Sequence, residues 1–513
     1  MRRSRPLPYA KLPATAPARV LAIRACALAR RHRLLAVLLV AGAVVRVLVE
    51  IAYRPALIFP DSSYYLHYAV HFTAPGDIRT TLYSDLIAPL TPLHALWLFP
   101  IAQHLLGLAA GVLGYAVLRR WGCPKWLAAI ASAALLLDPL ELILEHYILP
   151  DSLSVFLVLA VLAVLTWQPG RLSRRAARWT ALLLAVSVLV KVQTVILAVP
   201  IAAYMLAVIR PRRLLLKRGI AMSCLLAVPL VAWAFWFHET RGPWALTDYT
   251  GRWLYGRVAQ FADCTTLKLP ADERPLCPAQ PVSQRYQDFY MWNHHSPQWE
   301  LRPPPGASAG TVAGAFALRV MAHQPLTFAR VVGVDYVYGF APVRHTGPER
   351  YPEQYLRFQP AFPVFSWHDT SKVLRTYGHT TAAVQPQAAR ILWWYGAVTT
   401  PGPLLPAAIL AALAAAAGIG RARRSRLRPV CLLFGLTALL ITVPDVAVST
   451  FDWRYQLPQI VLAPLAGGLG VAALTGRGSA ATAGTGAGQA AAAAVARERE
   501  AAATGGDAVS VPD

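Results

Sequence analysis

Charged residues are scarce in this chain. Only 14% of its 513 residues are Asp, Glu, Lys or Arg, whereas a soluble domain carries about a quarter. Hydrophobic residues make up 56% of the sequence, and the mean hydropathy is +0.43. This shortage of charge excludes an ordinary soluble globular protein and indicates an integral membrane protein.

Acidic residues are scarcer still, because 25 Asp and Glu against 49 Lys and Arg give a formal net charge of +24. A basic excess of this size can indicate nucleic-acid binding. Here, however, the basic residues fall in clusters between apolar segments and do not gather on one face. That distribution is typical of cytoplasmic loops, so we expect membrane lipids, and no nucleic acid, as partners.

The apolar segments predict an all-α polytopic fold with about ten transmembrane helices, since a bilayer core needs about 20 apolar residues per helix. The predicted spans are 34–53, 90–118, 126–144, 149–167, 179–190, 192–209, 220–237, 391–419, 430–443 and 457–474.

Basic residues set the predicted topology. They precede the first span and fill every second loop, with Arg119 in one such loop and Arg423 in another. The positive-inside rule then predicts a multi-pass protein of the cytoplasmic membrane with both termini in the cytoplasm. The basic segment 1–33 leads into an uncleaved signal anchor. The Ala- and Gly-rich tail 475–513 cannot bury a core and is predicted to be disordered.

Two segments are expected outside the membrane. In the first outer loop, 54–89, the aromatic run at 64–68 predicts a short helix in the interface. A mixed extracytoplasmic domain or lid, 238–390, lies between the seventh and eighth helices. It separates an N-terminal catalytic membrane core, 34–237, from the C-terminal helices, 391–474.

The chain has six cysteines, and no spacing among them is that of a zinc site. Cys264 and Cys277 both fall in the expected outer segment, where an oxidising compartment permits a disulfide. We predict that they form one, which stabilises the fold by about 3 kcal/mol in the chain-entropy model. Two unpaired thiols are the alternative.

Ionisable residues are predicted at the outer ends of several helices. Asp61 follows the first span, Glu145, His146 and Asp151 surround the turn between the third and fourth, and Arg454 begins the last. Such residues are costly at membrane depth unless they line a cavity or form pairs, so they are candidates for function. We expect them to converge on one face.

The acids also have plainer interpretations. Asp61 and Asp151 each follow a proline and precede a serine. In the plainer interpretation, each residue serves as a helix N-cap and has no other role. Glu145 can be an exposed loop acid.

The cations likewise have two interpretations. Lys191 lies between two short spans and can mark a turn at the outer surface, or its ammonium can bind a phosphate. Arg454 can bind a substrate phosphate, pair with Asp452, or contact lipid headgroups.

Two histidines, His67 and His71, are four residues apart and would share one helical face. His146 is the candidate for a third metal ligand, but two histidines alone do not make a metal site. We therefore assign no residues to a metal site and leave a divalent cation open.

With these residues in place, the chain resembles the GT-C class of integral membrane glycosyltransferases, which use polyprenyl-phosphate-linked sugars. It is similar to the superfamily of protein O-mannosyltransferases and aminoarabinose transferases, in an Arg- and Ala-rich, actinobacterial form. The matching segments are Pro60-Asp61-Ser62-Ser63-Tyr64-Tyr65, Glu145-His146-Tyr147-Ile148-Leu149-Pro150-Asp151 and Arg454-Tyr455. Asp61 is followed by Ser62, where the O-mannosyltransferases have an Asp-Glu pair, which speaks against a protein acceptor.

The resemblance implies transfer of a sugar, with inversion, from a polyprenyl-phosphate donor to an acceptor hydroxyl at the outer membrane face. Asp61 would be the general base. The donor phosphate would bind Arg454, Lys191 and Tyr455. The residues implied to hold the acceptor, the sugar or a divalent cation are Glu145, His146, Asp151, Tyr64 and Tyr65. No nucleotide site is visible, so a soluble nucleotide sugar is not expected.

A multi-pass transporter or lipid flippase of envelope precursors is the main alternative, because it too would place ionisable residues among helices. Transporters usually show internal repeats, and none is clear between the halves of this chain. A third reading is a non-catalytic assembly protein for envelope polymers. The sequence leaves the sugar open among mannose, arabinose and galactose, and the acceptor open among lipid, glycan, wall polymer and protein.

Overall fold

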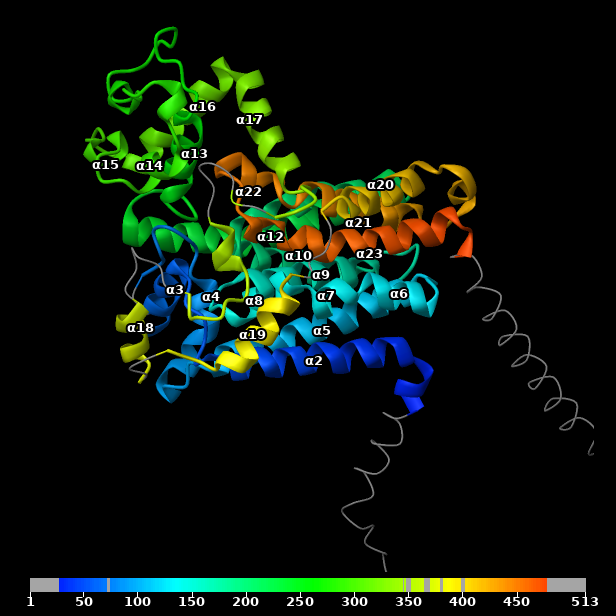
Figure 1. Cartoon of the computed structure of the whole chain (residues 1–513). Coiled ribbons are helices and arrows are strands. Elements are labelled where there is room, and N and C mark those ends of the chain that lie inside the picture. The colour runs from blue at the N-terminus through cyan, green and yellow to red at the C-terminus, as the bar shows by residue number, and fades with distance from the viewer. Residues whose placement is uncertain are drawn as a thin grey trace, which may run out of the picture.

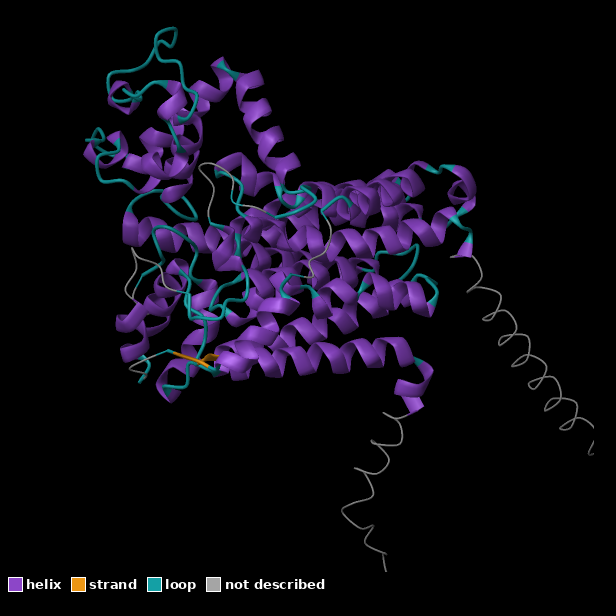
Figure 2. Cartoon of the chain, in the orientation of Figure 1, coloured by secondary structure: helices purple, strands orange, loops and turns teal. Residues whose placement is uncertain are grey.

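The computed structural model describes residues 27–71, 74–344, 346, 352–363, 370–378, 382–397 and 402–477. Most of the N-terminal segment and of the tail, for which the sequence makes predictions, lie outside these residues. The described chain is helical, with a small sheet in which β1 (Tyr53–Arg54) pairs antiparallel with β2 (Ala383–Val384) (Figure 2). The helical class predicted from the sequence is confirmed.

The first half of the chain is a series of helices that includes α3, the short helix predicted in the first outer loop. These elements are α2 (Arg33–Ala52), α3 (Pro60–Val70), α4 (Leu82–Ile87), η1 (Ala88–Leu93), α5 (Leu98–Arg120), α6 (Lys125–Ala131), α7 (Ala133–Leu137), α8 (Pro139–His146), α9 (Asp151–Thr166), α10 (Arg174–Val190), η2 (Val192–Leu197), α11 (Ala198–Val208) and α12 (Arg212–Arg241).

The second half begins with short helices and ends with the last helices of the bundle. These elements are α13 (Tyr249–Ala259), η3 (Arg274–Leu276), η4 (Val282–Gln284), α14 (Gln287–Trp292), α15 (Pro297–Glu300), α16 (Ala309–His323), α17 (Pro325–Tyr338), η5 (Glu353–Leu356), α18 (Thr370–Thr376), α19 (Pro386–Tyr395), α20 (Leu404–Ala417), η6 (Gly420–Arg424), α21 (Arg428–Leu440), α22 (Val443–Val448), η7 (Trp453–Gln456) and α23 (Leu457–Leu474).

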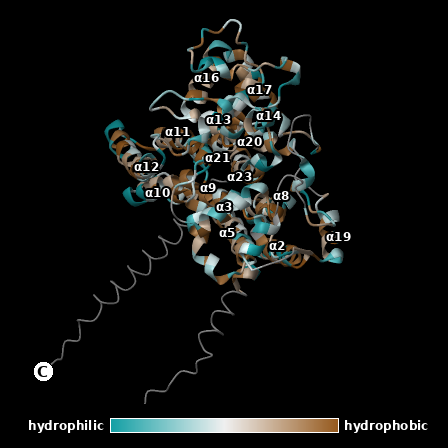
Figure 3. Cartoon of the chain, turned by 90° about the vertical axis from the view of Figure 1, so that its left-hand side faces the viewer, coloured by the Kyte–Doolittle hydropathy of each residue, from teal (hydrophilic) through white to brown (hydrophobic). Residues whose placement is uncertain are grey.

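Five helical segments of the described chain are long and apolar enough to cross a membrane, so the predicted count of about ten is not established. They are Arg33–Ala52, Leu98–Arg120, Arg212–Arg241, Arg428–Val448 and Trp453–Leu474. Shorter apolar helices lie at Asp151–Thr166, Val192–Val208 and Leu404–Ala417. Hydrophobic stretches, brown in Figure 3, occur on the helices of the bundle among more polar ones.

Three predicted spans are not continuous helices. The span 90–118 is divided into η1 and α5 by residues 94–97, where His94 adopts a left-handed conformation. The span 126–144 is divided into α6, α7 and α8, with the first break at Ser132. The second break arises because Pro139 cannot continue a helix and the Asp138 carboxylate caps the new one at the Leu140 N–H, 2.9 Å away. The span 391–419 is replaced by α19, which packs on α2, and α20, which packs on α21 and α23. Its sequence contains Pro401-Gly402-Pro403, which interrupts a helix.

The segment 238–390, which the sequence predicts to lie outside the membrane and which is called the outer segment below, has its own hydrophobic core. Helices α13 to α17 gather at one end of the bundle, opposite the end where α2 begins and α23 ends (Figure 1). Tyr255, Tyr290 and Phe316 are buried in this core. The predicted disulfide is present between Cys264 and Cys277, on its edge. The sequence predicted a mixed segment here. Among its described residues the regular structure is helical apart from the short strand β2.

Candidate active site

Asp61 lies in the first turn of α3 and is held there by two arginines. The N-cap of this helix is Phe59, whose N–H donates to the Ser62 hydroxyl at 3.0 Å. Asp61 is therefore not the N-cap, and its carboxylate is free for other contacts. Oδ1 is 3.1 Å from a guanidinium nitrogen of Arg79, and Oδ2 accepts a hydrogen bond from Arg454 at 3.0 Å.

Asp151 forms the second half of the same charged cluster. It is the first residue of α9, and its carboxylate makes no cap hydrogen bond, so the capping interpretation is wrong here too. Its Oδ1 accepts a hydrogen bond from Lys191 Nζ at 3.0 Å and lies 3.7 Å from Arg454 Nε. Lys191 ends α10 in an extended conformation before η2, so the predicted break at this residue is confirmed.

Arg454 joins the two acids because the chain around it fixes its side chain. Asp452 is the N-cap of η7, and its carboxylate accepts a hydrogen bond from the Arg454 backbone N–H at 3.0 Å. The guanidinium then lies over the ring of Phe59, 5.0 Å from its centroid, and 5.8 Å from that of Tyr455. Asp452 thus contacts the backbone of Arg454, whereas the guanidinium pairs with Asp61 and Asp151.

The electrostatics of the cluster favour an ionised Asp61. Burial alone would raise the pKa of this carboxyl, but the charges of Arg79 and Arg454 outweigh burial and hold its pKa below the usual value. Burial lowers the pKa of Arg79, but the neighbouring groups, Asp61 foremost, together raise it above its usual value. The cluster consists of three cations, Arg79, Arg454 and Lys191, and two acids, Asp61 and Asp151. Two further acids, Asp445 and Asp452, lie close enough to interact with Arg454, and Asp445 also lines the neighbouring cavity.

A cavity of about 220 Å³ opens beside this cluster. Arg79, Asp151, Lys191, Arg454 and Tyr455 all line it. Tyr65 also lines it, together with residues from the outer segment such as Trp253. The site thus lies where the helical bundle meets the outer segment, and it combines the carboxylates of Asp151 and Asp445 with three cations and aromatic rings.

The structure brings together most of the predicted site residues but separates two of them. Glu145 and His146 are both fully buried, and their side chains contact Arg46 and His104 and not the Asp61 cluster. The interpretation of Glu145 as an exposed loop acid is therefore wrong. His146 also lies apart from His67 and His71, which contact each other on α3.

Arg79 is the residue that sequence reasoning missed. It stands in the first outer loop without a motif around it. Tyr64 fixes its position, since the phenol oxygen donates to the Arg79 carbonyl at 3.0 Å and accepts from its N–H at 3.1 Å. Tyr64 is thus a positioning residue for Arg79, not a lining residue of the cavity. The signal available in the sequence was an arginine within the first outer loop, 18 residues after Asp61.

No protein-family model and no curated protein matches this chain. Two solved structures show similarity. The protein O-mannosyltransferase Pmt1-Pmt2 complex of S. cerevisiae, bound to the sugar donor, is 16% identical over 47% of this chain and 37% of that chain, with a TM-score of 0.33. ArnT from Cupriavidus metallidurans in the apo state is 16% identical over 84% of this chain and 77% of that chain, also with a TM-score of 0.33.

These matches are distant. The first covers little more than a third of the yeast chain, and a TM-score of 0.33 is too low to establish a shared fold.

Proposed function

We propose that this chain is a membrane glycosyltransferase. It would move a sugar from a polyprenyl-phosphate donor to an acceptor hydroxyl at the outer face of the cytoplasmic membrane, with inversion. The observation that carries the proposal is the Asp61 carboxylate held between Arg79 and Arg454 beside a cavity that Lys191 also lines. The Cys264–Cys277 disulfide supports an extracytoplasmic position for the outer segment, which adjoins this cavity.

The cations suit a phosphate leaving group. Arg454 Nε is buried and forms no hydrogen bond within the described chain, since the Asp151 oxygen 3.7 Å away is too far for one. A phosphate oxygen in the cavity would fill this position. Lys191 lies close enough to add a second positive charge, and Tyr455, beneath both cations, would limit access of water. Charge-assisted contacts of this kind stabilise a departing phosphate.

Phosphate binding would also activate the base. In the ion-paired state Asp61 is ionised but weakly basic, because two guanidinium groups stabilise its charge. A donor phosphate competes for Arg454 and so frees Oδ2, while Arg79 keeps Oδ1 in place. Asp61 then takes the proton of the acceptor hydroxyl as its oxygen attacks the anomeric carbon. The carbon–oxygen bond to the lipid phosphate breaks, and the phosphate leaves with the electron pair.

Donor affinity tests this arrangement. Arg454→Ala should weaken binding of a polyprenyl-phosphate sugar by about 10-fold or more, because it removes a charge-assisted contact. The matched control is Arg319→Ala, since Arg319 forms an ion pair with Glu273 in the outer segment, away from the cavity. Binding would be measured in nanodiscs by titration with a fluorescent donor. An Arg454→Ala protein that folds and binds the donor as tightly as wild type would contradict the phosphate contact.

A further inference from the structure

A second polar cluster lies apart from the proposed donor site, in the wall between α2, α5 and α8. It contains Glu50 near the end of α2, His104 in α5 and His146 at the end of α8. Glu50 Oε1 is 3.6 Å from His104 Nε2 and 3.8 Å from His146 Nδ1. The two ring nitrogens are 3.3 Å apart. Three polar atoms from three helices therefore surround one point.

The hydrogen bonds on the far sides of both rings fix where their protons are. His146 Nε2 is 2.7 Å from the carbonyl oxygen of Tyr53, which can only accept, so Nε2 carries the proton. His104 Nδ1 is 2.7 Å from Glu145 Oε2. Both Glu145 oxygens accept hydrogen bonds from Arg46, at 2.6 and 2.8 Å, so the carboxylate serves as an acceptor and here too the histidine donates.

These assignments leave lone pairs on the inner atoms. With the outer nitrogens protonated, neutral His104 and His146 each direct a lone pair at the other ring and toward Glu50. Glu50 Oε1 is itself buried and forms no hydrogen bond with any part of the chain that the structure describes. A proton shared between the two rings would satisfy them but leave this carboxylate oxygen without a partner. A cation bound to all three atoms satisfies every one of them.

The geometry points to a metal ion, and we propose that Glu50, His104 and His146 bind one divalent transition metal, best matched by Zn²⁺. Zinc takes His nitrogen and carboxylate oxygen at about 2.0 to 2.2 Å, so tetrahedral ligands stand about 3.3 to 3.6 Å from one another. The three observed separations of 3.3, 3.6 and 3.8 Å nearly fit this triangle without rearrangement. Two imidazoles and one carboxylate are a donor set that suits zinc better than magnesium or calcium.

The surroundings are those of a metal site. Metal-bound histidines usually donate their second nitrogen to a carboxylate or a carbonyl, which orients the ring. His104 does so to Glu145, and His146 does so to Tyr53. The pair of Glu145 with Arg46 fits closely beneath α5, where a side chain at Gly107 would lie 1.7 Å from Glu145 Oε1. The supporting groups are therefore as tightly placed as the ligands.

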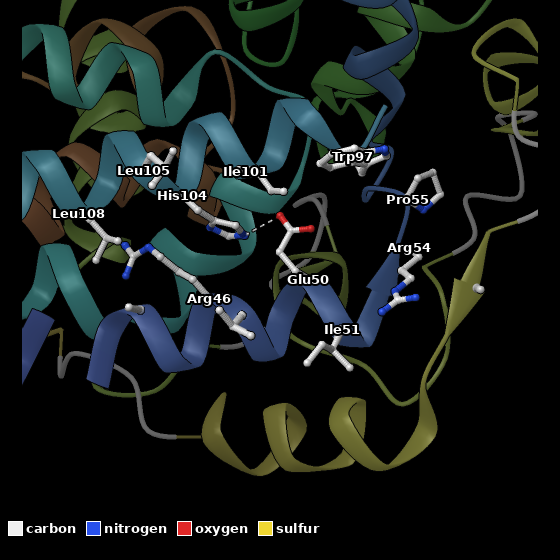
Figure 4. A pocket seen from close by; sticks show the side chains of 13 residues that line it. Arg46, Glu50, Ile51, Arg54, Pro55, Trp97, Ile101, His104, Leu105 and Leu108 are labelled. Atoms are coloured by element: carbon white, nitrogen blue, oxygen red, sulfur yellow. Dashed lines mark ion pairs between the residues drawn. The ribbon is translucent and has the colours of Figure 1, made fainter. Parts of the chain in front are cut away.

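The proposed ion would keep one open coordination position. Glu50 and His104 line a cavity of about 880 Å³ between α2 and α5, with Trp97 and Arg54 at its edge (Figure 4). Their side chains point toward each other across it (Figure 4). Three protein ligands and an open fourth position are the arrangement of zinc sites that bind water or a ligand. The fourth position would accept water or an oxygen-bearing ligand that enters the cavity.

Metal content and affinity test the proposal directly. Full-length protein purified with a tag that contains no histidine would be stripped with chelator, titrated with Zn²⁺, and measured by elemental analysis and calorimetry. Wild type should bind one equivalent. Glu50→Gln and His104→Ala should each lower the affinity at least 10-fold. The control with both His67→Ala and His71→Ala should retain it, because this pair lies apart from the cluster.

Spectroscopy shows whether a variant that fails to bind metal has lost only the metal site or is unfolded. Glu50 is the ligand least buried in the protein, so Glu50→Gln should fold, and its thermal transition without metal should match that of wild type. Co²⁺ in the wild-type site should show the intense visible absorption of a tetrahedral ion, and Glu50→Gln should lose it. Folded wild type that binds no Zn²⁺ at micromolar concentration would overturn the proposal. So would equal affinity in wild type and in a folded Glu50→Gln variant.

Discussion

Replacing Asp61 by Asn should separate donor binding from sugar transfer. The substitution removes the negative charge that faces Arg79 and Arg454 at 3.1 and 3.0 Å. Arg79, Arg454 and Lys191 then keep their three positive charges, while the site loses one of its negative charges and retains Asp151, with Asp445 and Asp452 nearby. Asn keeps the shape of the side chain, and its amide oxygen can still accept a hydrogen bond from either arginine. We therefore expect the variant to fold.

The expected change in donor affinity follows from the same distances. A phosphate on the far side of the Arg454 guanidinium stands about 6 Å from the Asp61 carboxylate, where two unit charges repel by about 3 kcal/mol at an effective dielectric constant of 20. Removing that repulsion should tighten donor binding by about 10-fold or more, after allowance for screening. Transfer should fall by about 10²- to 10⁴-fold, the usual contribution of a general base.

The assay is a donor titration and a single-turnover measurement on the same nanodisc preparation. Asp263→Asn is the matched control, because Asp263 is an exposed acid of the outer segment and should leave both quantities unchanged. Tighter binding with lost transfer supports the account. Near-normal transfer by Asp61→Asn would refute the base, and lost binding together with lost transfer would refute the charge argument.

Three further substitutions test parts of the structure. Gly107→Ala should destabilise the protein by about 2 kcal/mol, because its methyl group collides with Glu145, whereas Gly219→Ala, which faces open space, should not lower the melting temperature. Cys264→Ser should cost about 3 kcal/mol through loss of the disulfide, with the free, exposed Cys224→Ser as a neutral control. Burial raises the pKa of Asp452 to about 6, so the neutral form of Asp452 favours folding at low pH and this contribution is lost as the pH rises through 6. Between pH 5 and 7 wild type should lose about 1 kcal/mol that Asp452→Asn does not lose, and equal melting-temperature profiles for the two proteins would contradict that pKa.

The sequence predicted the cluster around Asp61 because its members stand beside helix ends that hydropathy locates. Asp61, Asp151, Lys191 and Arg454 each adjoin an apolar segment, and apolar length with loop charge is a strong signal. The same reasoning predicted the short helix α3 and the Cys264–Cys277 disulfide. The same reasoning predicted one continuous helix across Pro139, where the structure has two, because the hydropathy of a whole segment is hardly changed by one proline.

Side-chain partners across helices were beyond the reach of the sequence. Arg46 and Glu50 lie inside the first span, where hydropathy counts them as isolated charges, and the partner Glu145 of Arg46 is 99 residues away. His104 likewise lies in an apolar helix, and the sequence does not indicate its partners. These residues become a cluster only when α2, α5 and α8 pack together, and one sequence contains no record of which helices do so. For the same reason Glu145 and His146 were assigned to the Asp61 site.

The central claim is that this chain transfers sugar from a lipid-linked donor, and turnover measures it most directly. Purified protein in nanodiscs would be offered a panel of polyprenyl-phosphate sugars with candidate acceptors, and release of the polyprenyl phosphate would be followed for wild type and Asp61→Asn. The account predicts that wild type consumes one donor of the panel and that Asp61→Asn binds but does not consume it. If wild type neither binds nor consumes any donor, the claim is contradicted and a transporter becomes the better interpretation.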